Sequence, residues 1–191
     1  MCNNYAAHVP ANRIAEAFEG AGSVLRFEGG AVPNLEPRDD IRIGDTAPVV
    51  TWDGEGPVLR AMTWAWRSPQ GRPVFNFRSD GRSFVSSTRC LIPADAFYEF
   101  TEAEPGQKRK TKWRFTVREK DWFWIAGIVR DGAWAMLTTE PGPDIAPYHD
   151  RQIVLSGLDA SALDWLSSGL PAVGFLAPSP PGLLRVEKVF P

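Results

Sequence analysis

The stretch KWRFTVREKDWFWIAGIVRDGAWAMLTTE (residues 112–140) alternates aromatic and polar residues, and charged residues interrupt it at EKD and at RDG. Alternation with a period of two is typical of β-strands that bury one face, and short polar interruptions are typical of tight turns. The stretch therefore predicts a meander of three strands.

Strand-like segments continue on both sides of this stretch. Residues 47–66 predict a hairpin that turns at DGEG, and residues 83–100 contain two strand-like pieces near a proline corner. Residues 152–156 and 183–190 add two more strands. Residues 102–112, with mixed charge, predict an exposed hairpin tip.

Helical spacing is confined to two segments. Residues 11–22 and 161–169 place apolar side chains at helical intervals with glycine following, and Asp159 or Ser161 is a suitable N-cap for the second. Many short strands and few helices predict a mainly β (α+β) fold, in which an antiparallel sheet closes into a barrel or sandwich with short helices at its edges. We expect one domain over residues 2–191.

Composition excludes several classes of protein. The net charge is −2 with a pI near 5.7, which gives no overall signal for nucleic-acid binding. No apolar run is long enough to span a membrane, and the start lacks the pattern of a signal peptide. Two cysteines make neither a disulfide framework nor a zinc site, so we expect a reducing cytoplasmic setting and no metal or cofactor.

Cys2 follows the initiator methionine in MCNNYAAHVP. Loss of Met1 would leave an α-amine and a thiol on adjacent carbons, with ordinary pKa values of about 7.7–8.0 and about 8.5. Both groups would then be partly nucleophilic at neutral pH. Such a 1,2-aminothiol condenses with an aldehyde to an imine and then closes to a thiazolidine. The alternative is that Cys2 is a small core residue, which is the commoner role.

Two further residues suit proton transfer. Glu99 lies among aromatic residues in CLIPADAFYEF, where burial would raise its pKa and make it an acid or base near pH 7. An outward-facing strand glutamate is an equal alternative. His149, one of two histidines, precedes a strand-like run, and the alternative for it is a solvated loop residue.

A third group of residues suits nucleic-acid binding. Asn76 and Arg78 share a face of an extended segment, and Arg82 lies close by. Trp64 and Trp66 are also two apart, so they could share a face and stack on the bases of a single strand. The alternatives are solvated arginines and core tryptophans.

Taken in order, these segments resemble the SRAP family, the SOS response-associated peptidases or abasic-site processing proteins. Six motifs along the chain carry the resemblance: Met1-Cys2, PNLEP (33–37), MTWAW (62–66), NFRSD (76–80), RCLIPADAFYEF (89–100), and the late pair LTTEP with HDRQIVLS. The segment around Glu99 is the most specific.

The resemblance implies a barrel-like β fold and binding of single-stranded DNA that carries an abasic site. Cys2 would cross-link to the ring-opened sugar aldehyde, Asn76 would orient it, Glu99 would act as acid and base, and His149 would transfer protons. The DNA contacts implied are Arg78, Arg82, Trp64, Asn34 and Pro37. Monomeric action, autoprocessing of Met1 and a weak lyase side reaction are further expectations.

The chain departs from the family pattern at several positions. Asn3 and Asn4 replace the Gly-Arg that commonly follows the cysteine, and Gln152 and Ile153 replace a Met-Pro pair. Two other functions therefore stay open: a non-covalent module that binds single-stranded DNA or protein and has lost the chemistry, and a thiol peptidase.

Overall fold

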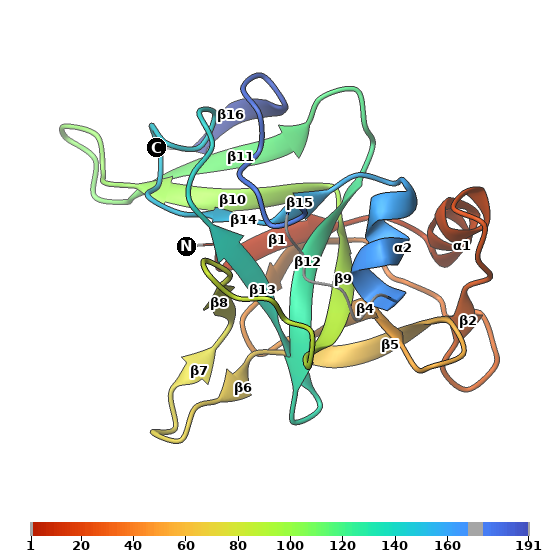
Figure 1. Ribbon diagram of the computed structural model, residues 1–191. Coiled ribbons are helices and arrows are strands. Elements are labelled where there is room, and N and C mark those ends of the chain that lie inside the picture. The colour runs from red at the N-terminus through yellow and green to blue at the C-terminus, as the bar shows by residue number, and fades with distance from the viewer. Residues whose placement is uncertain (1, 168–173, 191) are drawn as a thin grey trace.

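The computed structural model describes residues 2–167 and 174–190 and is mainly β (Figure 1). One sheet has five strands, in the spatial order β16 (Leu184–Phe190), β11 (Thr111–Val117), β10 (Ala96–Thr101), β1 (Asn4–Ala7) and β3 (Arg38–Arg42). The larger sheet runs in the order β14 (Gln152–Ile153), β13 (Ala133–Thr139), β12 (Phe123–Arg130), β9 (Thr88–Ala94), β4 (Thr46–Trp52), β5 (Pro57–Trp64) and β2 (Arg26–Phe27).

Shorter elements complete the fold. They are β15 (Leu155–Ser156), which pairs with β12, β8 (Asn76–Arg78), which pairs with β13, the small hairpin of β6 (Trp66–Arg67) and β7 (Pro73–Val74), and the helices α1 (Ala11–Gly20) and α2 (Ala160–Ser167).

The larger sheet closes on itself. Strand β13 pairs with β12 on one side and, in parallel, with β5 on the other, where Trp134 faces Trp64. The ring β13–β12–β9–β4–β5 is therefore continuous, and closure removes the exposed edges that an open sheet would leave. The predicted mainly β, barrel-like fold is confirmed.

Most of the predicted elements are present. The hairpin predicted over residues 47–66 forms from β4 and β5, with Trp52 opposite Pro57 across the turn, and ends at Trp64 because Trp66 belongs to β6. The exposed loop after Thr101 joins β10 to β11, with Thr101 opposite Thr111. Asp159 caps α2, because its Oδ1 accepts the Ser161 backbone N–H at 2.9 Å. The predicted end of that helix at residues 168–169 lies outside the described residues.

The predicted three-strand meander is wrong in one respect. Strands β12 and β13 form a hairpin, but β11 pairs with β10 and β16 in the other sheet. Strand β12 is paired with β9 from Phe123 to Val129 on one edge and with β15 and β13 on the other, so it offers β11 no free edge. The turn after β11, where Glu119 has a φ of 58°, leads the chain from one sheet to the other.

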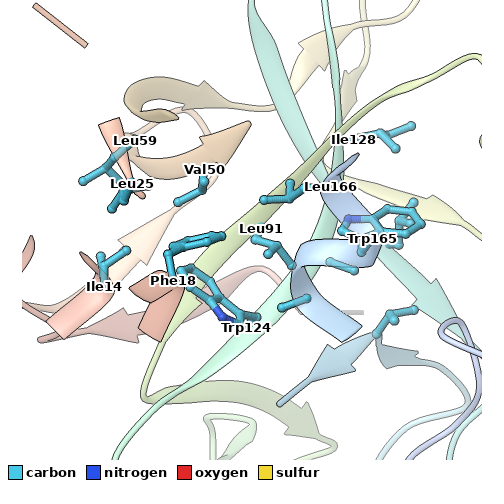
Figure 2. Packing of buried hydrophobic residues seen from close by; sticks show 14 of the residues in the cluster. Ile14, Phe18, Leu25, Val50, Leu59, Leu91, Trp124, Ile128, Trp165 and Leu166 are labelled. Carbon is cyan, nitrogen blue, oxygen red and sulfur yellow. The ribbon is translucent and has the colours of Figure 1, made fainter. Parts of the chain in front are cut away.

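Alternation along β12 divides the core into two clusters. Trp124, Ala126 and Ile128 pack with the helices, and Figure 2 shows Phe18 of α1 and Trp165 of α2 in this cluster around Leu91 and Trp124. The intervening residues Phe123 and Ile125 pack toward the five-stranded sheet. The second cluster also contains Cys2, so the start of the chain is built into the layer between the two sheets.

Gly127 on β12 supplies the first prediction. A Cβ at this position would lie 2.7 Å from Ile92 Cδ1 and 2.8 Å from both Ala135 O and Cys90 Sγ. Gly127→Ala should therefore lower the free energy of unfolding by about 1–3 kcal/mol or more in urea denaturation. Gly20→Ala, where nothing lies within 4 Å of the new methyl group, is the matched control. Equal stability of the two variants would contradict this close packing inside the barrel.

Candidate active site

Cys2 lies just before β1 and is almost fully buried, with 1% of its surface exposed. Its thiol donates to the backbone oxygen of Asn4 at 3.3 Å. Burial, followed by the charge of Glu99, raises the pKa of the thiol from 9.0 to about 12. Burial therefore holds the thiol in its protonated form at neutral pH, in contrast to the ordinary thiol pKa of about 8.5 of a free cysteine.

Asn76 ties the start of the chain to the barrel. It lies on β8, which pairs in parallel with β13 so that Asn76 faces Met136. Its Nδ2 donates to the backbone oxygen of Cys2 at 2.7 Å. Its Oδ1 is buried and accepts no hydrogen bond within the ranges that the structure describes. A buried acceptor without a partner is costly, so this oxygen is suited to receive a donor from a ligand.

Glu99 faces inward from β10, where it lies opposite Trp113 of β11. Only 2% of its surface is exposed, so of the two alternatives for this residue the buried one is correct. Burial raises the pKa of its carboxyl group from 4.5 to about 7, although the charge of the amino terminus acts in the opposite direction. Glu99 can therefore give or take a proton near neutral pH.

His149 follows a turn that packs against β11. The ring of the preceding Tyr148 lies 4.7 Å from that of Trp113, centroid to centroid. Burial, followed by the positive charge of the amino terminus, lowers the pKa of His149, which is neutral near pH 7 as a result. The backbone N–H of Arg151 donates to His149 Nδ1 at 3.0 Å, which favours the tautomer with its proton on Nε2. Asp150 Oδ1 lies 2.9 Å from the same nitrogen but is largely exposed and competes weakly.

Two buried residues after His149 anchor its turn. The guanidinium of Arg151 donates to Thr138 O at 2.8 Å and to Asp80 Oδ2 at 2.6 Å, and so joins the turn to β13 and to the segment after β8. Gln152 Oε1 accepts the Gly142 N–H at 2.7 Å and the Ser179 hydroxyl at 3.1 Å. The sequence predicted no role for either side chain, although an arginine two positions after the histidine is visible in it.

The four candidate catalytic residues thus come from distant parts of the chain. Asn76 bonds to Cys2, and the charge of Glu99 acts on the Cys2 thiol. The charge of Asp150, the residue after His149, acts on Glu99. The arrangement combines a protected thiol, a carboxyl group that titrates near pH 7 and a neutral imidazole, which suits stepwise proton transfer.

The predicted stacking platform is absent. Trp64 is fully buried, its indole N–H donates to Phe75 O at 2.9 Å, and its ring stacks on Trp134 with centroids 5.2 Å apart. Trp66 is also buried but belongs to the other core cluster. Ala65 between them has a φ of 90°, and this break in the extended backbone sends the two rings to different cores. The core alternative is correct for both tryptophans.

The remaining DNA-binding candidates are exposed. Arg78 projects from the end of β8, and the guanidinium of Arg82 lies 4.8 Å from the centroid of the Phe77 ring. Asn34 donates to Glu36 at 2.6 Å, and Pro37 directly precedes β3. These positions leave the two arginines accessible to phosphates, whereas Asn34 is engaged with its own neighbour.

Residues 2–167 and 174–190 hold neither a candidate metal centre nor a candidate membrane span. Within these ranges no cluster of three or more His, Cys, Asp and Glu side chains is placed to hold a metal ion. No helix in the same ranges is long and apolar enough to cross a membrane. Cys2 and Cys90 are both free and buried.

The family model and the sequence relatives that match this chain carry related names. The sequence model of SOS response associated peptidase (SRAP) matches residues 1–174. Abasic site processing protein YoqW of Bacillus subtilis is 28% identical over 122 residues, which span 54% of this chain and 52% of YoqW. YoaM of the same organism, also named an abasic site processing protein, is 24% identical over 191 residues, which span 87% of this chain and 79% of YoaM. The chain thus spans about half the length of YoqW.

Solved structures share the fold. A phage-related protein from Bordetella bronchiseptica superimposes with a TM-score of 0.72 at 19% identity, over 98% of this chain and 94% of that one. A protein from Bacteroides thetaiotaomicron gives a TM-score of 0.75 at 16% identity, over 99% and 92% of the two chains.

Proposed function

The chain belongs to the SOS response associated peptidase (SRAP) family, and from this premise we propose that it senses abasic sites in single-stranded DNA. After removal of Met1, Cys2 forms a covalent thiazolidine with the ring-opened sugar and so protects the lesion. The protein acts as one domain over residues 2–191, as a monomer, in the cytoplasm and on nucleoid DNA. The names of YoqW and YoaM support abasic-site processing as the general activity.

One observation carries the proposal. Asn76 Nδ2 bonds to the backbone oxygen of Cys2 at 2.7 Å and so fixes the start of the chain beside Glu99, whose pKa is about 7. A residue held by its own carbonyl presents its amine and thiol in a fixed direction. Such fixed geometry converts reaction with a bound aldehyde into an effectively intramolecular step.

The first half of the reaction makes an imine. The sugar ring opens to the aldehyde as His149 accepts the proton of the C1 hydroxyl group and passes it to the ring oxygen. The free α-amine of Cys2 then attacks the aldehyde carbon, and the carbinolamine forms. Glu99 in its protonated form donates to the departing hydroxyl group, and one water leaves as the imine forms.

The second half closes the ring. The Cys2 sulfur adds to the imine carbon, and the thiol proton passes through the Glu99 carboxylate to the nitrogen. The sum of the two halves is one aldehyde and one aminothiol giving one thiazolidine and one water. A high thiol pKa favours this order, because the amine reacts first and the thiol loses its proton only beside Glu99. Elimination from the imine is the competing lyase reaction.

Arg78 and Arg82 hold the phosphates of the strand in this proposal. Both guanidinium groups are exposed near β8, the strand that also carries Asn76. Arginine matches phosphate through paired N–H donors. Strand β8 then connects the phosphate contacts to the reactive terminus, because it carries both Arg78 and Asn76.

A denaturing gel tests this proposal. Purified protein is incubated with a labelled single strand that carries one abasic site, with an intact strand of the same sequence, and with the abasic strand in a duplex. We expect a heat-stable slow band with the abasic single strand alone. Absence of that band, or an equal band with the intact strand, would refute the proposed cross-link.

Burial of the Cys2 thiol, at 1% exposure and with a raised pKa, favours one other function, a non-covalent binding module. Fluorescence anisotropy separates the two. Binding that is equal for intact and abasic strands and fully reversed by salt would support the module. Binding to the abasic strand that salt does not reverse would support the cross-link.

Arg151 gives a prediction on positioning. Arg151→Met removes the bonds to Thr138 and Asp80 that hold the His149 turn, and we expect the rate of adduct formation to fall by up to about 100-fold. Asp80→Asn keeps the bonds to Thr138 and should have the smaller effect. The readout is the single-turnover rate well below the melting temperature. A lower melting temperature with an unchanged rate would mean that Arg151 acts only on stability.

A further inference from the structure

A segment near the end of the chain, residues 179–184, is bonded to the turn that carries His149. The family model matches residues 1–174, so this segment lies beyond the matched part of the chain. It leads into β16, and Figure 1 shows β16 next to the loop between β13 and β14, which contains His149. We call residues 179–184 the strap.

Asp144 lies in the turn and binds the strap through both of its carboxylate oxygens. Its Oδ1 accepts the Gly182 N–H at 3.0 Å, and its Oδ2 accepts the Leu184 N–H at 2.9 Å. Hydrogen bonds to an ionised carboxylate are about twice as strong as those between neutral groups. Leu184 is buried and begins β16, so the turn is bonded to the strap at the point where the strap enters the sheet.

Ser179 makes a second contact between the strap and the turn. Its hydroxyl donates to Gln152 Oε1 at 3.1 Å, and the same oxygen accepts the Gly142 N–H at 2.7 Å. A Cβ at Gly142 would collide with the backbone oxygen of Ser179, so only glycine allows the two backbones to lie this close. The strap is therefore packed against the beginning of the turn as well as bonded to it.

Backbone hydrogen bonds connect these contacts to His149. Gly142 O accepts the Ile145 N–H at 3.0 Å, and Ile145 O accepts the His149 N–H at 3.0 Å. Ile145 is fully buried in the core cluster that contains Cys2. The turn thus consists of consecutive hydrogen-bonded steps, so a displacement of Gly142 or Asp144 also displaces His149.

We propose that the strap positions His149 for proton transfer, and that Asp144 and Ser179 are positioning residues of the reaction. Both act through the turn, and neither is a catalytic residue. The proposal rests on the proposed function, because that function gives His149 its role at the sugar. A proton is transferred only within hydrogen-bond reach, about 2.6–3.2 Å between the heavy atoms, and an error of about 1 Å in position can cost about 100-fold in rate.

The imidazole of His149 reports the position of the turn without any DNA. The chain has two histidines, so NMR can follow the ring protons of His8 and His149 separately, and His8→Gln assigns them. Burial lowers the pKa of His149, so release of the turn should raise this pKa toward its ordinary value of about 6.5. Loss of a negative charge could only lower it, so a rise in Asp144→Ala identifies movement of the turn.

Single-turnover adduct formation, measured well below the melting temperature, gives the consequence for the reaction. We expect the rate of Asp144→Ala to fall by up to about 100-fold. Asp144→Asn keeps one acceptor oxygen and should restore part of the rate. Ser179→Ala removes one neutral hydrogen bond, which makes it the mildest variant, and it should change the rate and the His149 pKa in the same directions by less.

Asp159→Ala is the matched control. Asp159 also accepts two hydrogen bonds, from the backbone N–H and the hydroxyl of Ser161, but it caps α2. This variant should keep the parental pKa of His149 and the parental rate of adduct formation.

The two measurements together decide the matter. A parental pKa and rate in both Asp144→Ala and Ser179→Ala would overturn the proposal, and so would equal changes in Asp159→Ala or a raised pKa with a parental rate. If the parent protein forms no adduct, the proposed cross-link is refuted by that result. A raised His149 pKa in Asp144→Ala would then still support the strap, and an unchanged pKa would refute the strap as well.

Discussion

Cys2→Ala is expected to reduce the heat-stable adduct with abasic single-stranded DNA to background. Alanine keeps the terminal amine after Met1 is removed but lacks the sulfur that closes the ring. Its reaction therefore stops at the imine, which hydrolyses when the protein is heated. The measurement is the fraction of labelled strand shifted on a denaturing gel after heating.

Two further arms make the Cys2 experiment decisive. Borohydride added during the reaction should trap a Cys2→Ala adduct, because the imine still forms and reduction makes it stable. Cys90→Ala changes the other buried free cysteine and should cross-link as the parent protein does. A heat-stable adduct of Cys2→Ala at the parental level, without borohydride, would mean that the thiol takes no part.

Glu99→Gln is expected to slow adduct formation by about 100- to 10,000-fold, the usual range for loss of a general acid–base group. Glutamine fills the same space but neither gives nor takes a proton. With a pKa of about 7 for Glu99, the rate of the parent protein should show an inflection near pH 7 that the variant lacks. Single-turnover rates between pH 5.5 and 8.5, about 1.5 pH units on each side of that inflection, provide the test.

The same variant should be more stable at high pH. The folded protein binds the Glu99 proton more tightly than the unfolded chain does, since the pKa rises from 4.5 to about 7. Between these two pH values the folded state carries more protons, so its stability falls as pH rises, by about 3 kcal/mol in total. Glu99→Gln has no such proton to lose, so its stability should not fall in this way as the pH rises.

Urea denaturation at pH 5 and pH 8 measures that effect. We expect the stability of the parent protein to fall between the two pH values by more than that of Glu99→Gln. A variant that loses both the reaction and its stability at pH 8 would indicate a structural carboxylate instead of a catalytic one. A gain in stability with a loss of activity is typical of groups held in strained surroundings for function.

The contrast between β11 and β12 shows how far the sequence predicts this fold. Alternation identified both as strands, because burial of one face leaves a local pattern. The partner of each strand is not local. Strand β11 lies opposite β16 from the far end of the chain, and no feature between residues 112 and 123 records that pairing.

The candidate site shows the same limit. Phe97, Tyr98 and Phe100 surround Glu99 with aromatic residues on both sides of the strand, so alternation could not decide which way the carboxylate faces. Burial of Glu99 depends on the opposing Trp113, which only the sheet brings near. The prediction that Trp64 and Trp66 share a face was wrong for a different reason. The sequence suggested a regular alternation through these residues, and the positive φ at Ala65 breaks it.

The most direct test of the covalent mechanism is the intact mass of the protein before and after incubation with an abasic single strand. We predict that the free protein lacks Met1, and that the product has the summed masses of protein and strand less one water. Peptide mapping should locate the added mass on Cys2. Retention of Met1 in a protein that still forms the adduct, or attachment at another residue, would contradict the proposed chemistry.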